Sequence, residues 1–246
     1  MMKDRVVLIT GATRGIGKSI LYRFAEQGAK VVGIYASSRE RAEAIQEEWR
    51  ARGTEIMFAQ GSVTDPEFVR DTLQQVVSIH GTVDVLVNNA GITSDNFTSQ
   101  MSVQEWNRVF QTNFEGTYNC SREALVHMER QGSGKIVNVI SVTGVLGREA
   151  QSNYGASKGA VIGLTRMLAR QYSQKGIHIN AVAPGMIDTE MIGHVPEEKL
   201  ENFLLHTNLK RLGTSREVAD SVLFLSGDMS DYMSGSVLKV DGGFIR

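Results

Sequence analysis

The sequence is poor in the features that mark several classes of protein. Cys120 is the single cysteine and the five histidines are scattered, so the chain offers neither an internal disulfide nor a zinc-type spacing such as CxxC or HExxH. No apolar run approaches the roughly 18 residues of a membrane span, and the run at 6–9 is too short for a signal peptide. We therefore expect a cytoplasmic protein in a reducing compartment, with no metal site and no membrane partner.

The sequence also lacks an excess of charge of one sign. Its 26 Lys and Arg nearly balance its 27 Asp and Glu, which gives a formal net charge of −1. Such a balance provides no global basic field for binding nucleic acid, so we expect no nucleic-acid partner. The 246 residues contain no Pro/Ser-rich linker, internal repeat or low-complexity tract, and one domain over residues 1–246 is the simplest interpretation.

Short apolar runs alternate with longer segments of helical period along the whole chain. The runs that predict strands cover 6–9, 30–34, 55–59, 83–87, 135–140, 178–182 and 237–240. The segments that predict helices cover 15–27, 39–50, 66–79, 103–130, 153–174, 197–206 and 217–225. This alternation is typical of an α/β fold in which helices cover both faces of a parallel sheet, here a doubly wound sheet of about seven strands.

A glycine-rich turn joins the first predicted strand to the first predicted helix. In the segment TGATRGIG, Gly11 permits a tight turn, Gly15 lets the backbone approach a ligand, and Gly17 lets the helix pack on the strand. The N-terminus of the helix attracts a pyrophosphate group. A merely structural turn is the alternative, but the strand-turn-helix context favours a dinucleotide site and a Rossmann fold.

The end of the second predicted strand indicates which dinucleotide binds. A site selective for NAD carries an acidic residue there, whereas this chain has Ser37, Ser38 and Arg39, with Arg14 nearby. Two hydroxyls and two guanidinium groups suit the 2′-phosphate of NADPH, which we expect as the cofactor. The alternative is that the serines only cap the next helix and that Arg39 is a solvated helix residue.

Tyr154 and Lys158 stand four residues apart on a predicted helix, so their side chains share one face, roughly 6 Å apart along the axis. An ammonium about 5 Å from a phenol contributes on the order of 3 kcal/mol, much of the about 4 kcal/mol needed to bring a tyrosine pKa from about 10 to near 7. Lys158 is therefore expected to lower the pKa of Tyr154. YxxxK alone is a common helix pair with no such role.

Further candidate site residues follow two other predicted strands. Ser141 follows the strand at 135–140, and its hydroxyl is placed to hold a substrate carbonyl beside Tyr154. Asn89, Ala90 and Gly91 end the strand at 83–87, where they suit a backbone wall for the cofactor. Each of these is also explained as a turn or a cap. The glycine-rich turn, the Tyr154–Lys158 pair, Ser141 and the segment after strand 83–87 all fall at the same sheet edge. Four independent coincidences of this kind are improbable.

In combination, these motifs resemble the short-chain dehydrogenase/reductase family over nearly the full length of the chain. They are TGATRGIG at Thr10, NNAG at Asn88, Asn113 within QTNFEG, Ser141, YGASK at Tyr154 and Pro184-Gly185 before Ile187. The resemblance implies that Asn113, Ser141, Tyr154 and Lys158 form a catalytic tetrad in which Tyr154 donates a proton and Asn113 holds a water that links Lys158 to solvent. It also implies a cofactor site formed by Gly11, Thr13, Arg14, Gly15, Ile16, Gly17, Ser37, Ser38, Arg39, Ser62, Val63, Asn89, Ala90, Gly91, Tyr154, Lys158, Pro184, Gly185, Ile187 and Thr189.

Within the family, the sequence is most similar to reductases of 3-oxoacyl thioesters linked to an acyl carrier protein. The segments that carry this likeness include Asn89 to Thr93, Asp95-Asn96, Ala183 to Met191, Arg211 to Gly213 and the closing Val240 to Gly243. Three positions depart from the pattern: Ser62 replaces an acid or amide that binds adenine, Ser94 a common arginine, and Gly132 a basic residue for the carrier. Acetoacetyl-CoA reductases, ketoreductases of polyketide or secondary-metabolite pathways and, more remotely, a non-catalytic NADP-binding sensor or scaffold remain alternatives.

The segment 186–212 is longer than ordinary connections and rich in Met, Ile and Leu, which predicts a lid over the substrate. We expect Met186, Met191, Ile192, Phe203 and Leu204 to close over an acyl chain, with Ser141, Gln151 and Tyr154 also at the substrate. Arg130, Arg170 and Lys175 are candidates for contacts with an acidic carrier protein. An ordinary solvated helix face explains them equally well. The resemblance further implies a homotetramer formed through the helices at 103–130 and 153–174.

Overall fold

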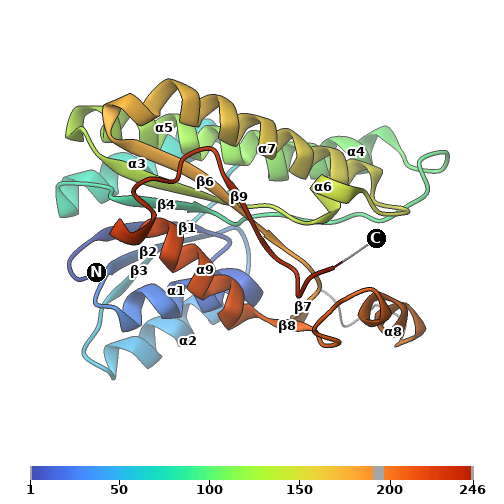
Figure 1. Ribbon diagram of the computed structural model, residues 1–246. Coiled ribbons are helices and arrows are strands. Elements are labelled where there is room, and N and C mark those ends of the chain that lie inside the picture. The colour runs from blue at the N-terminus through green and yellow to red at the C-terminus, as the bar shows by residue number, and fades with distance from the viewer. Residues whose placement is uncertain (1, 191–196, 245–246) are drawn as a thin grey trace.

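The computed structural model describes residues 2–190 and 197–244. A twisted sheet lies between two layers of helices (Figure 1). Its strands are β1 Val6–Thr10, β2 Lys30–Tyr35, β3 Ile56–Gln60, β4 Val85–Asn88, β5 Gly134–Val139, β6 Ile177–Pro184 and β9 Val237–Val240. They are parallel in the order β3-β2-β1-β4-β5-β6-β9. The predicted doubly wound Rossmann fold is confirmed.

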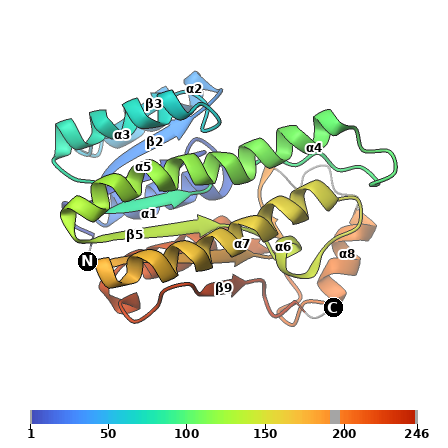
Figure 2. The same ribbon diagram turned by 90° about the horizontal axis from the view of Figure 1, so that it is seen from above.

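Helices cover both faces of this sheet. One face carries α1 Gly15–Glu26, α2 Arg39–Arg50 and α9 Ser215–Ser226, and the other carries α3 Pro66–His80, α5 Gly116–Gln131 and α7 Ser152–Tyr172 (Figures 1 and 2). Buried β-branched and aliphatic side chains fill both sheet faces, and all five residues of β1 are buried. The strand order reverses between β1 and β4, and open α/β sheets bind ligands at such a point.

The helix predicted at 103–130 is divided in the structure. α4 Val103–Phe110 is followed by a wide π-helical turn, Gln111–Glu115, and then by α5. The sequence contains no Pro or Gly between 103 and 115 to mark this change, and such single wide turns occur frequently at functional sites. Asn113 lies in the wide turn and is fully buried.

Short elements that the sequence did not predict lie near the carboxyl ends of the strands. They are α6 Thr143–Leu146, β7 Ile187–Asp188 and β8 Gly213–Thr214, and β7 pairs with β8 in parallel. Within residues 2–190 and 197–244, 3-10 turns also occur at Ser173–Lys175 and Asp228–Ser230. Elements of two to four residues are too short to show a period of hydrophobicity, so pattern reasoning does not detect them.

The described parts of the segment 186–212, residues 186–190 and 197–212, lie at the end of the molecule to which the strands point. They contain β7, α8 Glu197–Leu205 and the chain that leads to β8 (Figure 1). Met191 and Ile192, which were predicted to contact the substrate, lie outside the described residues. Among the residues that the structure describes, none of the helices combines the length and apolar character required to cross a bilayer.

Candidate active site

The glycine-rich turn forms a cradle at the start of α1. Gly11 and Gly15 have positive φ angles of 67° and 50°, which favour glycine. A Cβ atom on Gly17 would lie 2.1 Å from the Gly11 carbonyl oxygen, so any side chain there would force the helix away from the turn. A Cβ on Gly15 would meet only Thr189, at 3.7 Å. Backbone N–H groups at this helix start and the open approach beside Gly15 fit a pyrophosphate.

The end of β4 is tied to this cradle. The Asn89 side-chain amide donates to the carbonyl oxygens of Thr10 and Gly11, at 3.0 and 3.1 Å. A Cβ on Gly91 would lie 3.3 Å from both the Asn113 side-chain oxygen and Lys158 Nζ. The predicted backbone wall, from Asn89 to Gly91, therefore connects the cradle to the residues around Tyr154.

The residues predicted as a tetrad come together at the carboxyl ends of β4 and β5. Lys158 Nζ lies 5.8 Å from the centre of the Tyr154 ring and donates to the Val139 carbonyl oxygen at 2.9 Å. Ser141 forms a side-chain hydrogen bond with Tyr154 and accepts one from the Thr143 backbone N–H at 3.1 Å. The helix spacing of Tyr154 and Lys158 thus produces the predicted proximity.

Burial dominates the protonation of this pair. It raises the pKa of Tyr154 to about 12, although the hydrogen bond from Ser141 acts in the opposite direction. Burial likewise lowers the pKa of Lys158 to about 8. The expected lowering of the Tyr154 pKa by Lys158 is therefore not seen in this structure. The sequence argument considered charge at a distance and omitted the cost of removing both groups from water.

Asn113 is held rigidly in the wide turn before α5. Its side-chain oxygen accepts from the Ile92 backbone N–H at 2.8 Å, and its amide nitrogen donates to the Ile92 carbonyl oxygen and to Ser157 Oγ, each at 3.0 Å. Its backbone carbonyl accepts from the Thr117 hydroxyl at 2.8 Å. Asn113 therefore joins the loop after β4 to α7, and its predicted water remains a prediction.

The adenosine side of the site differs in detail from the sequence prediction. Arg39 donates to Gln60 Oε1, at 3.2 Å from Nε and 2.9 Å from Nη2, whereas Arg41 pairs with Glu190 at 3.0 Å. Arg41 lines a cavity of about 380 Å³ together with the predicted phosphate ligand Arg14. Other residues of that wall include Thr13, Gly15 and Lys18. The sequence reasoning missed Arg41, two residues beyond Arg39 on α2.

Two other predicted adenosine contacts are already engaged within the protein. The Ser62 hydroxyl lies 2.8 Å from the Thr64 hydroxyl and accepts from the Thr64 backbone N–H at 3.2 Å. Val63 is buried, and its carbonyl oxygen accepts from the Asn119 side chain at 3.1 Å. Ser38 adopts a left-handed conformation, with φ of 75°, immediately before α2. These contacts shape the loops after β2 and β3.

The predicted substrate residue Gln151 is buried immediately before α7. Its side-chain nitrogen donates to Asp95 Oδ2 at 2.8 Å, and its oxygen accepts from the Thr143 hydroxyl at 3.4 Å. Asp95 and Arg148 both act electrostatically on Tyr154: the carboxylate raises its pKa and the guanidinium lowers it. The sequence reasoning assigned no role to Asp95 or Arg148, because only the fold brings them to the phenol.

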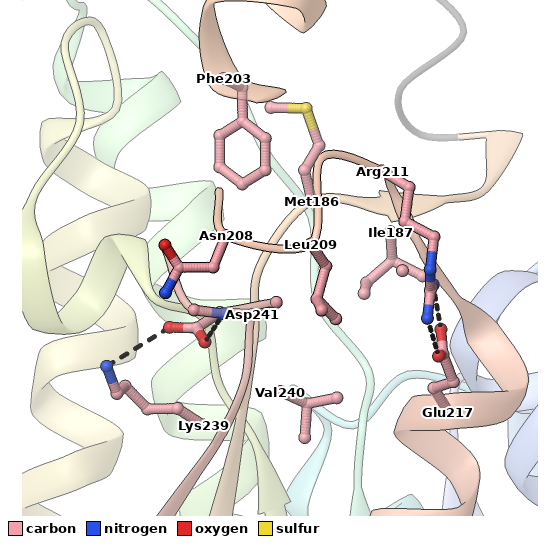
Figure 3. A pocket seen from close by; sticks show the side chains of 13 residues that line it. Met186, Ile187, Phe203, Asn208, Leu209, Arg211, Glu217, Lys239, Val240 and Asp241 are labelled. Atoms are coloured by element: carbon pink, nitrogen blue, oxygen red, sulfur yellow. Dashed lines mark hydrogen bonds and ion pairs between the residues drawn. The ribbon is translucent and has the colours of Figure 1, made fainter. Parts of the chain in front are cut away.

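A cavity of about 420 Å³ lies beneath the segment 186–212 (Figure 3). Met186, Phe203 and Leu209 contribute apolar side chains to its wall. An Arg211–Glu217 ion pair and a Lys239–Asp241 ion pair lie on opposite sides of it. Met186 thus borders a mainly apolar space, and its contact with an acyl chain stays a prediction.

The predicted carrier-binding residues are exposed but lie far from Tyr154. Arg130 is in the last turn of α5, Arg170 is in the last turn of α7, and Lys175 follows α7. Lys175 forms an ion pair with Glu129. Tyr154 is near the first residue of α7, so the length of that helix, roughly 30 Å, separates it from Lys175.

Known proteins are similar to this chain in sequence and in fold. Residues 5–200 match the family model for short chain dehydrogenases. The chain is 44% identical to a 3-oxoacyl-[acyl-carrier-protein] reductase of Staphylococcus aureus, with 99% of both chains covered, and 38% identical to that of Escherichia coli, with 98% and 97% covered. A crystal structure from Agrobacterium tumefaciens described as a gluconate dehydrogenase superposes with a TM-score of 0.95 at 32% identity, covering 99% of this chain and 96% of the other.

The fold, the cradle and these matches define an oxidoreductase. More particularly, the chain belongs to the short-chain dehydrogenase/reductase family, and the resemblance stated from its motifs is confirmed.

Proposed function

We propose that this protein reduces a 3-oxoacyl thioester, carried by an acyl carrier protein, to the 3-hydroxyacyl thioester with NADPH. The proposal depends on one observation: Tyr154, Lys158 and Ser141 converge beside the glycine cradle at the carboxyl ends of the strands. The names of relatives at 38–44% identity over nearly the full chain support the substrate class, and we assign the reaction to fatty-acid synthesis on that basis.

When bound, NADPH supplies the hydride that reaches the carbonyl carbon of the substrate. Tyr154 donates its phenolic proton to the carbonyl oxygen, and its raised pKa keeps it protonated until the oxygen becomes basic. Ser141 donates a hydrogen bond to the same oxygen and stabilises the charge that develops there. Lys158 lies beside the phenol and stabilises the phenolate that remains after proton transfer.

The preference for NADPH is supported by charge at the adenosine side. The segment after β2 has no acid before Glu40, and Arg14 and Arg41 border one cavity. We assign the 2′-phosphate to Arg14 and Arg41, with the Ser37 hydroxyl as a further ligand expected from the sequence, and Arg41 would exchange Glu190 for the phosphate when NADPH binds. Arg39 has the smaller share in this proposal because its guanidinium group contacts Gln60 and, unlike Arg41, does not line the cavity that Arg14 borders.

The acyl chain is assigned to the apolar space beneath the segment 186–212. Met186 and Phe203 line it, and Gln151, which donates to Asp95, lies three residues before Tyr154 and is assigned to the thioester end of the substrate. The segment 186–212 is proposed to act as the lid over this space within one domain.

We call Arg130, Arg170 and Lys175 the carrier surface. Its position favours a homotetramer in which a carrier bound to one copy delivers its thioester to the active site of another. A thioester arm attached near Arg130, Arg170 and Lys175 is separated from Tyr154 of the same chain by the length of α7. Antiparallel packing of α5 and α7 between two copies would bring this surface close to the partner's site. Exposed Tyr118, Val126 and Met167 on these helices supply apolar contacts for such packing.

Steady-state kinetics with acyl-carrier and CoA thioesters test the substrate assignment. We expect a larger kcat/KM for the carrier-linked thioester, and a faster oxidation of NADPH than of NADH.

Reversal of charge in R130E and R170E tests the carrier surface. It should raise KM for the carrier-linked substrate about tenfold and leave KM for the CoA ester unchanged, because only the acidic carrier contacts this surface. Equal effects on both substrates would contradict a docking role.

An acetoacetyl-CoA reductase is the second candidate function. One observation favours it: Gly132, where carrier-dependent relatives were expected to have a basic residue, ends α5 with a positive φ of 69°. A left-handed conformation at the end of a helix favours glycine, which has no side chain to contact a carrier protein. A CoA ester needs no such contact. A kcat/KM for acetoacetyl-CoA above that for the carrier thioester would establish this candidate in place of the first.

A further inference from the structure

The closing motif Asp241-Gly242-Gly243 turns the end of the chain back along the lid segment. The Gly243 N–H donates to Asp241 Oδ1 at 3.1 Å, which fixes the turn. Gly242 and Gly243 have φ angles of 65° and 73°. A Cβ on Gly242 would lie 2.8 Å from Thr207 Cγ2, and one on Gly243 would lie 2.7 Å from Asn208 Nδ2. Both glycines are therefore required for this close approach.

The turn is paired with the chain that follows α8. The Asn208 N–H donates to the Gly243 carbonyl oxygen at 3.3 Å, and the Leu209 N–H donates to the Gly242 carbonyl oxygen at 3.1 Å. Thr207 and Phe244 form an antiparallel bridge at the end of this pairing. These contacts fix the C-terminal end of the lid helix to the sheet through β9.

Phe244 extends the pairing into the lid itself. Its ring stacks on that of Phe203 in α8, with centroids 4.6 Å apart and planes 9° from parallel. Phe203 lines the cavity of about 420 Å³, and Leu209, which is part of the pairing, lines it too. The position of this cavity wall is thus set by the residues of the closing turn.

Asp241 connects the closing turn to the sheet. Its side chain is only 7% exposed, and it pairs with Lys239 of β9 at 3.4 Å. A Cβ on Gly185 would lie 2.8 Å from the Asp241 Cα, so the turn also packs directly against the end of β6, just before Met186. The closing turn therefore contacts both sides of the cavity, near Met186 and near Phe203.

We propose that Phe244 is a positioning residue for substrate specificity, because its ring and the turn that carries it hold Phe203 and Leu209 as the wall of the cavity that takes the acyl chain. This inference rests on the proposed function, since it assigns that cavity to the acyl chain. The same contacts give Gly242 and Gly243 a physical role, since they let the closing turn approach Thr207 and Asn208.

Substitution of Phe244 tests the proposal with thioesters of two lengths. In F244A we expect KM for a four-carbon 3-oxoacyl thioester to rise about threefold or more with little change in kcat, because Tyr154 is untouched. The ratio of kcat/KM for an eight-carbon substrate to that for a four-carbon substrate should rise, because Phe203 and Leu209 are no longer held in place and the cavity can accept a longer chain. F244Y keeps the ring and should restore wild-type values. Y232A removes a fully exposed aromatic side chain and serves as the matched control.

Hydrogen exchange gives a readout that does not depend on turnover. The amide protons of Asn208 and Leu209 should exchange at least tenfold faster in F244A and in G243A, whereas those of β1 should not change. Unchanged exchange together with unchanged chain-length preference in F244A would overturn the proposal. A wild-type protein that reduces no thioester would instead refute the proposed function, and the exchange result would still decide whether the closing turn holds the lid segment.

Discussion

Asn89 donates two hydrogen bonds to Thr10, one from its backbone and one from its side chain. The Thr10 hydroxyl accepts from the Asn89 backbone N–H at 3.0 Å, and the Asn89 side-chain amide donates to the Thr10 carbonyl oxygen at the same distance. The Thr10 hydroxyl also accepts from the Ala90 N–H at 2.9 Å. One buried hydroxyl therefore accepts from the two backbone N–H groups that follow β4, those of Asn89 and Ala90. These bonds fix the end of β4 to the glycine cradle.

Replacement of Thr10 by valine should destabilise the protein and weaken cofactor binding. T10V keeps the shape but leaves two N–H groups without an acceptor, at a cost of about 1–3 kcal/mol for each. Urea denaturation should report the loss of stability, and titration with NADPH a higher Kd. T10S keeps the hydroxyl and should behave as wild type; a fully stable T10V would show that these bonds contribute nothing.

Tyr154 should be required for reduction but not for binding. Y154F removes the proton donor without altering the fold, so kcat should fall by about 100-fold or more. Fluorescence titration should give an NADPH affinity close to that of wild type. Turnover that remained unchanged in Y154F would remove Tyr154 from its proposed role.

The pH profile of reduction should shift in opposite directions in two charge variants. Reduction requires the protonated phenol, so the rate is present below the apparent pKa of Tyr154 and is lost as the pH rises through it. Burial is the main cause of its high pKa, Asp95 adds to the increase, and Arg148 opposes it. D95N should therefore move the falling limb to lower pH by about half a unit, and R148Q should move it to higher pH.

Asn at position 95 still accepts a hydrogen bond from Gln151, so D95N separates the charge of Asp95 from its hydrogen bond. Asp95 is exposed, and the shift should therefore shrink at high salt. Shifts in the same direction for both variants would disprove the electrostatic account.

Arg41 should contribute more than Arg39 to the choice of NADPH. A guanidinium–phosphate hydrogen bond contributes about 1.5–3 kcal/mol, so R41A should lower kcat/KM for NADPH about tenfold or more and leave NADH nearly unchanged. R39A loses mainly the contact with Gln60 and should change the NADPH/NADH ratio much less. The reverse order of effects would return the role to Arg39.

Local sequence patterns were sufficient for the sheet and for half of the candidate site. The apolar run that became β1, followed by Gly11, Gly15 and Gly17, indicated strand, turn and helix within a dozen residues. The four-residue spacing of Tyr154 and Lys158 depends only on helix geometry. Ser141 was placed correctly because the carboxyl ends of parallel strands meet at the same edge.

The remaining features depend on contacts between distant segments. Asp95 and Gln151 are 56 residues apart and neither belongs to a periodic pattern. The pKa of Tyr154 is set by how completely the whole fold buries it, which residue spacing does not report. Arg39 and Arg41 are chemically equivalent in the sequence, and only their surroundings in the fold distinguish them: Arg39 contacts Gln60, whereas Arg41 contacts Glu190 and lines the cavity beside Arg14.

The wide turn at Gln111–Glu115 sets the rotational phase between α4 and α5. Each residue of an α-helix advances the side chains by about 100°, so a deletion of one residue there would turn every side chain of α4 by that angle relative to α5. A deletion between Phe110 and Phe114 would therefore turn these two rings, whose centroids lie 5.2 Å apart, away from each other. The length of this short stretch is consequently as constrained as its residues, although it lies within a continuous rod.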